Sequence, residues 1–245
     1  SFSKLMNQKA KELGCKNSNF VNPNGLYNDN HYTTAYDLAT IARQFFSNDL
    51  LCKMSSTSTY EISPTPSQPD DIIIHSKNKL LPDREYTYDY LVGSKTGFTS
   101  EARQTLVSCA KKDGLTLICV IMKEESPNQF TDTVSLFDYG FSNFTKMTIA
   151  DHESDYNVSS TDFFQVENNF FGNSSSILTI DEEAYVVLPN SVTFDDIQSE
   201  LVYNEDSSDT VATIQYKYQN IPIGSADVTM SSPVEPVSEK PLPPS

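Results

Sequence analysis

The sequence contains no tryptophan, few basic residues and no long apolar run. Its 245 residues include 17 Lys and Arg against 33 Asp and Glu, which gives a net charge of −16. Such an excess of negative charge repels phosphate backbones and anionic lipid headgroups, so we expect no nucleic acid among its partners. A helix that crosses a membrane needs about 20 consecutive apolar residues, and the sequence has neither such a stretch nor a signal-peptide pattern at its start.

Cysteine is also sparse, with four residues far apart along the chain: Cys15, Cys52, Cys109 and Cys119. Zinc sites and redox motifs place two cysteines within a few residues of each other, and the sequence lacks that spacing. We therefore expect no metal and no other cofactor, and we interpret the cysteines as small buried apolar side chains. Their even number permits disulfides without requiring them.

Two amphipathic helices are predicted near the start of the chain. Apolar residues recur at helical spacing over residues 2–13, and Gly14 can take the left-handed conformation that ends a helix. A second helix is predicted over residues 34–46. Thr34 and Asp37 have the spacing of a capping box, in which the hydroxyl and the carboxylate each satisfy a free backbone N–H of the first turn.

The middle of the chain predicts a β-hairpin followed by a third helix. Strand-like runs at residues 104–110 and 115–122 flank an Asp-Gly pair at 113–114, which favours a hairpin turn because both positions tolerate positive φ. Ser126 and Pro127 are typical of a helix start. The apolar residues that follow have the spacing to pack inward: Phe130, Val134, Phe137 and Phe141.

Composition divides the chain into two predicted domains and a tail. Residues 1–147 contain the helices and the hairpin, with short edge strands and a surface loop expected in the proline-containing stretch 55–79. A small all-β domain is predicted at residues 148–232, where short alternating runs are separated by Asn, Ser, Asp and Gly. Residues 233–245 have the composition of a stiff, extended linker. The alternating runs are residues 184–188, 197–203 and 210–218.

The segment that points to chemistry is residues 93–99, Gly-Ser-Lys-Thr-Gly-Phe-Thr, directly before the predicted hairpin. The Lys95 ammonium beside the Thr96 hydroxyl can bind a carboxylate, because one supplies charge and the other a directed hydrogen bond. Gly97 would let a ligand approach the backbone closely. The backbone N–H of Phe98 would be one of two donors that stabilise an oxyanion if acyl transfer occurs. Alone, the tripeptide also fits a solvated lysine before a turn.

Five segments together resemble the low-molecular-weight penicillin-binding proteins, which are serine-type D-alanyl-D-alanine carboxypeptidases: residues 5–14, 19–26, 31–39, 93–99 and 138–141. The resemblance implies an α/β (α+β) penicillin-recognising domain of the β-lactamase and transpeptidase type, N-terminally truncated, followed by a small all-β sandwich. It also implies a chemistry in which a Ser, activated by a Lys one helical turn later, attacks the D-Ala-D-Ala end of a peptidoglycan stem peptide. β-Lactam antibiotics mimic that substrate.

The nucleophile of that family is not expected within these residues. The resemblance places the Ser-x-x-Lys and Ser-x-Asn motifs upstream of Ser1, and the only Ser-x-x-Lys of the chain, residues 1–4, falls in the wrong element. We therefore expect the chain to be inactive alone. The resemblance further implies an extracytoplasmic enzyme that contacts the membrane only through a missing C-terminal anchor beyond the linker.

The expected catalytic residues are Lys95, Thr96, Gly97 and Phe98, and the expected substrate-binding residues are Lys95, Thr96, Thr99 and Gln129. Gln129 lies where the resemblance places an Arg that helps to hold the substrate carboxylate, so we expect a weaker anion site. Two alternatives stay open. One is a non-catalytic module of the same fold that binds cell-wall peptides or a protein partner. The other is a β-lactamase, which the appended β-domain and the proline-rich tail disfavour.

Overall fold

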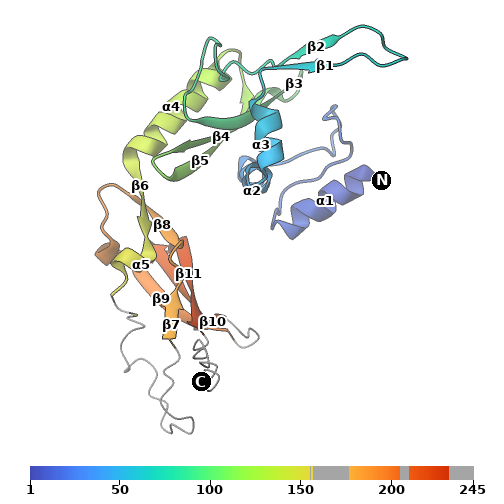
Figure 1. Ribbon diagram of the computed structural model, residues 1–245. Helices are drawn as coiled ribbons and strands as arrows, with labels where there is room; N and C mark the ends of the chain where they lie inside the picture. The colour runs from blue at the N-terminus through green and yellow to red at the C-terminus, as the bar shows by residue number, and fades with distance from the viewer. Residues whose placement is uncertain (155, 157–176, 205–209, 232–245) are drawn as a thin grey trace, which may run out of the picture. The chain divides into compact units, whose positions relative to one another are not determined.

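The computed structural model describes residues 1–154, 156, 177–204 and 210–231 (Figure 1). Its contacts divide the chain into two compact units, Ser1–Asn143 and Phe144–Ser245. The linker predicted at residues 233–245 lies outside the described residues. None of the helices in the described ranges is long and apolar enough to cross a membrane.

An antiparallel three-stranded sheet forms the centre of the first unit. Its strands, in spatial order, are β3 (Leu91–Thr99), β4 (Arg103–Lys112) and β5 (Leu115–Glu124). The β4–β5 turn has a positive φ at Asp113 (50°) and Gly114 (81°), so the predicted hairpin turn is confirmed. A separate hairpin, β1 (Thr59–Ile62) with β2 (Ile72–His75), projects from the unit with every strand residue exposed (Figure 1).

Four helices belong to this unit: α1 (Phe2–Glu12), α2 (Ala35–Phe46), α3 (Asp49–Ser56) and α4 (Asn128–Asn143). Helix α1 ends as predicted, with Gly14 at φ 87°. The N–H groups of Gly14 and Cys15 donate to the carbonyls of Lys11 and Ala10, both at 3.0 Å, which is the paired bonding of a Schellman motif. Helix α3 was not predicted, because its eight residues are too few to establish a helical period.

The capping-box prediction for α2 is only half right. The Thr34 hydroxyl accepts from the Asp37 N–H at 3.2 Å, as expected of an N-cap. The Asp37 carboxylate does not accept from the backbone N–H of Thr34, as a capping box requires. It accepts instead from the Asn17 N–H (2.7 Å), the Ser18 hydroxyl (2.7 Å) and the Lys16 N–H (3.4 Å). Asp37 therefore attaches the preceding loop to α2.

The three-stranded sheet carries helices on both faces. The residues of α4 that the sequence predicts to face inward pack in one apolar cluster with Leu106 and Ala110 of β4, which confirms that prediction. On the opposite face, Gly93 of β3 lies against α2 and α3, because a Cβ there would meet Ser55 and come within 3.1 Å of the Phe46 ring. Helix α4 begins at Asn128, so Pro127 precedes the helix rather than opening its first turn.

The second unit contains two antiparallel sheets, and its described part is β-rich with two short helical turns. The larger sheet has the order β7-β11-β10-β9 and the smaller one is β6-β8. The strands are β6 (Phe144–Thr148), β7 (Ile177–Ile180), β8 (Tyr185–Pro189), β9 (Gln198–Tyr203), β10 (Thr210–Tyr218) and β11 (Ile221–Ser231). The helical turns are α5 (Ile149–His152) and η1 (Phe194–Asp196).

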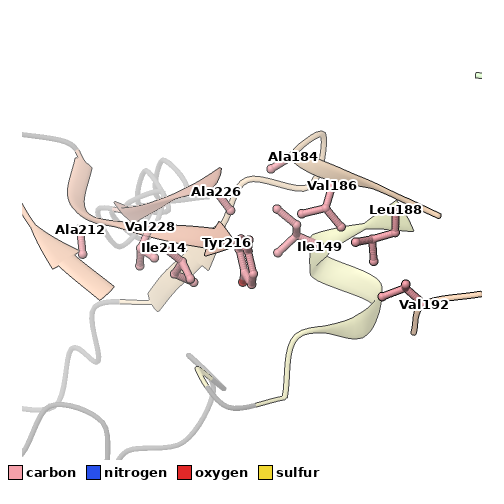
Figure 2. Packing of buried hydrophobic residues seen from close by; sticks show 10 residues of the cluster. All are labelled: Ile149, Ala184, Val186, Leu188, Val192, Ala212, Ile214, Tyr216, Ala226 and Val228. Atoms are coloured by element: carbon pink, nitrogen blue, oxygen red, sulfur yellow. The ribbon is translucent and has the colours of Figure 1, made fainter. Parts of the chain in front are cut away.

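One apolar core joins the two sheets of this unit. Ile149 of α5 lies between Val186 and Leu188 of β8 on one side and Ile214 of β10 and Val228 of β11 on the other, within one apolar cluster (Figure 2). Each of these five side chains is at most 3% exposed. Because burial of apolar area is the dominant favourable term in folding, this cluster stabilises the second unit.

Strand β11 was missed by the sequence analysis because Pro222 and Gly224 interrupt its pattern. Gly224 is required there, since a Cβ would lie 2.5 Å from the Tyr185 carbonyl oxygen. The turn before it uses Gln219 and Asn220, both with positive φ, although neither is glycine. This turn therefore lacks the Gly that usually signals a two-residue hairpin.

Candidate active site

Residues 93–99 form most of β3, and β3 lies at an edge of its sheet. Its register with β4 pairs Lys95 with Val107, Thr96 with Leu106, and Phe98 with Gln104. Within the described ranges the other edge of β3 pairs with no strand. An open edge presents backbone N–H and C=O groups that an extended peptide can bind.

The side chains of Lys95 and Thr96 point to opposite faces of the sheet, as neighbours on a strand do. Lys95 is exposed and Thr96 is half-buried. The Lys95 ammonium donates to the backbone carbonyl of Thr96, and no carboxylate pairs with it anywhere in the part of the chain that the structure describes. Lys95 therefore offers a positive charge to an anionic group from outside these residues.

The other predicted residues of β3 have distinct surroundings. A Cβ on Gly97 would lie 2.5 Å from the Thr105 hydroxyl, so the Thr105 side chain occupies the space beside Gly97. The Phe98 side chain is 60% exposed and leaves an apolar surface beside the segment. The Thr99 hydroxyl accepts from the Ala102 N–H at 3.0 Å and so holds the β3–β4 turn.

Gln129 is buried rather than open to a ligand. It is 3% exposed, and its amide nitrogen lies 3.5 Å from the side-chain oxygen of Gln104, the residue opposite Phe98. Its own side-chain oxygen has no hydrogen-bond partner among the described residues. Gln129 thus lies close to the predicted site, one strand away from β3, with its polar end directed into the protein.

Sequence reasoning missed a buried polar group behind β3. Asn78, 2% exposed, donates its amide to the hydroxyl of Ser94, 4% exposed and directly before Lys95. Sixteen residues separate the two along the chain, so no local pattern could have found the contact. The one available signal was a polar residue, Ser94, within an otherwise strand-forming run.

The cysteines do not form a reactive site. Burial raises the pKa of the Cys109 and Cys119 thiols to about 11, which keeps them protonated at neutral pH. Cys15 and Cys52 are only half-buried, whereas the sequence analysis expected all four cysteines to be buried. Across the described ranges, no group of three or more His, Cys, Asp or Glu residues could hold a metal ion.

The segment at residues 1–4 shows no catalytic pairing. The Ser1 hydroxyl bonds to the Ser3 hydroxyl at 3.0 Å, and both residues lie at the start of α1. Among the described residues no hydrogen bond joins either hydroxyl to Lys4. A Ser activated by a Lys needs that contact, because the base must take the hydroxyl proton.

The helix-covered sheet with Lys-Thr-Gly on its edge strand, followed by a β-rich unit, has the architecture of penicillin-binding proteins. Solved structures share it across nearly the whole chain. A peptidoglycan synthesis regulatory factor (PBP3) from Streptococcus pneumoniae aligns with a TM-score of 0.68 at 21% identity, covering 95% of this chain and 68% of that one. Penicillin-binding protein 5 from Haemophilus influenzae aligns with a TM-score of 0.65 at 22% identity, covering 94% of this chain and 64% of that one. At these identities the likeness shows the fold alone.

The family follows from the sequence comparison. The model of peptidase family S11, D-alanyl-D-alanine carboxypeptidase, matches residues 1–126, and the chain belongs to this family. The D-alanyl-D-alanine carboxypeptidase DacF of Bacillus subtilis is 35% identical over 144 residues, which are 58% of this chain and 36% of the relative. The chain spans about a third to a half of the length of the curated relatives that it matches.

Proposed function

We propose that this chain supplies the carboxylate-binding strand of a D-Ala-D-Ala carboxypeptidase that trims peptidoglycan stem peptides. The observation that carries the proposal is Lys95, exposed and without a carboxylate partner in the described residues, on the open edge of β3 in a member of family S11. The Lys95 ammonium suits the C-terminal carboxylate of such a peptide. The serine nucleophile and its lysine base would belong to a part of the protein outside these 245 residues.

In this mechanism the stem peptide lies along the edge of β3 with its terminal carboxylate at Lys95. The serine oxygen attacks the carbonyl carbon of the penultimate D-Ala while the lysine base takes the hydroxyl proton. The Phe98 N–H is one donor to the oxyanion of the tetrahedral intermediate. Collapse breaks the C–N bond as the lysine passes the proton to the leaving nitrogen, so the terminal D-Ala leaves with a free amine. Water then hydrolyses the acyl-serine, which releases the shortened peptide as a carboxylate and restores the serine hydroxyl. A β-lactam would acylate the same serine.

The proposal extends to the place of action. Cell-wall peptides lie outside the cytoplasm, so the enzyme would act there as a secreted serine peptidase. The β-rich domain at residues 148–232 would set the distance of the first domain from the membrane. The linker at residues 233–245 would lead to a C-terminal anchor in the full-length protein.

A second candidate is a non-catalytic module that binds cell-wall peptides or a protein partner. The observation that favours it is Gln129, whose buried amide adds no charge to the anion site. Under this alternative the complete protein would bind peptides without forming an acyl-enzyme.

Labelling with a fluorescent penicillin separates the two candidates. The samples are the full-length gene product, the 245-residue chain, and full-length Lys95→Ala and Lys111→Ala variants. Lys111 is the matched control, an exposed lysine at the far end of the neighbouring strand β4. The carboxypeptidase proposal predicts that the full-length wild type and Lys111→Ala label, that the 245-residue chain does not, and that Lys95→Ala labels at least about tenfold more slowly. An unlabelled full-length protein would overturn it in favour of the binding module.

A further inference from the structure

Strand β3 reaches Lys95 through two residues that are held from opposite faces of the sheet. Gly93 packs against Ser55 of α3 so closely that a Cβ would overlap the Ser55 hydroxyl. Ser94 points to the other face, where its hydroxyl accepts from the side-chain amide of Asn78. Because β3 is an edge strand, β4 supports it from one side only. The contacts at Gly93 and Ser94 therefore determine where the strand runs next.

Two further hydrogen bonds hold Asn78 itself in place, one at its side-chain oxygen and one at its backbone N–H. Its side-chain oxygen accepts from the Leu80 N–H at 3.0 Å, and its backbone N–H donates to the Ser76 hydroxyl at 3.3 Å. Leu80 and Leu81, directly beyond, are completely buried. The amide group that meets Ser94 is thus part of a fixed segment, and removal of its partner would leave a buried N–H without an acceptor.

We propose that Asn78 and Ser94 are positioning residues for the carboxylate-binding strand, their buried hydrogen bond fixing the backbone from which Lys95 and Thr96 project. The inference rests on the proposed function. In the described residues the Lys95 ammonium is bound only to the carbonyl of the next residue, so the position of its charge follows the backbone. A binding group gains from being held in place before the ligand arrives, and a misplacement of about 1 Å can cost a hundredfold in rate.

Ser108 provides a matched control within the same sheet. It lies directly opposite Ser94 on β4, is completely buried, and its hydroxyl has no partner among the described residues. Ser94→Ala and Ser108→Ala remove the same atom from neighbouring positions on one face. Only the first breaks a hydrogen bond and leaves the Asn78 amide unpaired.

Hydrogen exchange measured by mass spectrometry on the full-length gene product tests the positioning directly, in peptides that cover residues 91–99. Loss of the buried bond between Asn78 and Ser94 predicts exchange faster by about tenfold in Ser94→Ala, and by at least as much in Asn78→Ala, which also loses the bond from the Leu80 N–H, with Ser108→Ala unchanged. The double variant Asn78→Ala/Ser94→Ala should exchange no faster than Asn78→Ala, because the Asn78 change already breaks the only bond that the Ser94 change would break. Equal exchange in Ser94→Ala and Ser108→Ala would overturn the inference.

Acylation kinetics of the full-length gene product connect the strand to the site. We expect Ser94→Ala to require about tenfold more penicillin for half-maximal acylation, with little change in the rate at saturation, and Ser108→Ala to match the wild type. Wild-type kinetics in Ser94→Ala, despite faster exchange, would contradict a positioning role. A wild type that is not acylated at all would refute the proposed function, while the exchange data would still decide whether the bond holds β3.

Discussion

The two units of the protein bury different kinds of side chain. Six polar residues are buried in the described part of the chain, and all lie in the first unit: Asp37, Asn78, Ser94, Ser108, Gln129 and Thr133. The buried core of the second unit is apolar except for the Tyr216 hydroxyl, which donates to Glu153. Buried polar groups cost free energy unless they are hydrogen-bonded, so the polar interior of the first unit needs partners that the apolar core of the second does not.

The position of these polar residues explains the difference. Ser94 belongs to β3, Ser108 lies opposite it on β4, and Asn78 contacts Ser94. Gln129 reaches Gln104, which lies opposite Phe98. Ser94, Ser108, Asn78 and Gln129 thus lie on β3 or contact residues on or opposite it, whereas Asp37 bonds to the loop at residues 16–18 and Thr133 to the Gln129 carbonyl. Most of the buried polar contacts of the first unit thus lie near β3, whereas the described core of the second unit is apolar apart from the Tyr216 hydroxyl.

The largest effect is expected from a cavity in the second unit. Ile214→Ala removes a completely buried side chain and should lower the free energy of unfolding by about 2–5 kcal/mol. Hydrogen exchange in peptides covering residues 210–218 would measure it, with peptides from β4 unchanged. Ile221→Ala is the matched control, since Ile221 is 63% exposed and should cost less than about 0.5 kcal/mol. Similar costs at both positions would show that the core does not stabilise this unit.

A charge placed in the polar interior of the first unit should have the next largest effect. Gln129→Arg would bury a cation with no carboxylate partner and should cost more than about 2 kcal/mol. Gln129→Leu should stay within about 1 kcal/mol, because it loses only the 3.5 Å contact with Gln104, and the Gln129 oxygen has no partner among the described residues. Hydrogen exchange in peptides covering α4 would measure the stability of both variants. A stable Gln129→Arg protein would contradict the burial of this position. It would mean that the side chain at residue 129 can reach solvent and the anion site.

Asp37 predicts a pH dependence of the first unit. Hydrogen bonds from the Ser18 hydroxyl and from the backbone of Asn17 and Lys16 hold the pKa of Asp37 below its ordinary value. A carboxyl whose pKa is lower in the folded state contributes stability above its unfolded pKa of about 3.9, and that contribution is lost as the pH falls through the folded value. Asp37→Asn should therefore be less stable than the wild type at pH 7. Urea unfolding should show the gap closing below about pH 4; a constant gap would contradict the account.

The smallest effect concerns the thiols. At pH 8 a thiol with a pKa of about 11 is ionised in only about one molecule in a thousand, so Cys109 and Cys119 should react last with iodoacetamide. The half-buried Cys52 should react before them. Peptide mass spectrometry after timed alkylation would give the order. Early modification of Cys109 in the folded protein would show that the contact of β4 with α2 and α3 opens.

The features that sequence predicts well here are local. The end of α1 at Gly14, the turn at residues 113–114 and the inward face of α4 each depend on residues within one or two turns of one another, and all were confirmed. The predictions failed where a residue acts at a distance or where a pattern is broken. Asp37 has the spacing of a cap but bonds to a loop about 20 residues earlier, and Gly224 hides β11 because it is needed for a close approach to β8.

The candidate site divides in the same way. The Lys-Thr-Gly run is visible in the sequence because its residues are adjacent. Asn78 and the burial of Gln129 are not visible, since both depend on which segments the fold brings together. The roles of Lys95, Thr96, Gly97, Phe98, Thr99 and Gln129 in substrate binding and catalysis stay predictions.

The central claim is that this chain binds the substrate carboxylate while the serine nucleophile lies elsewhere in the full-length protein. Digestion of the penicillin-treated full-length gene product, followed by mass spectrometry of the labelled peptide, tests it most directly. The account predicts a penicilloyl adduct on a serine outside residues 1–245, in a Ser-x-x-Lys sequence. An adduct on a serine within these residues, Ser1 or Ser3 above all, would contradict it.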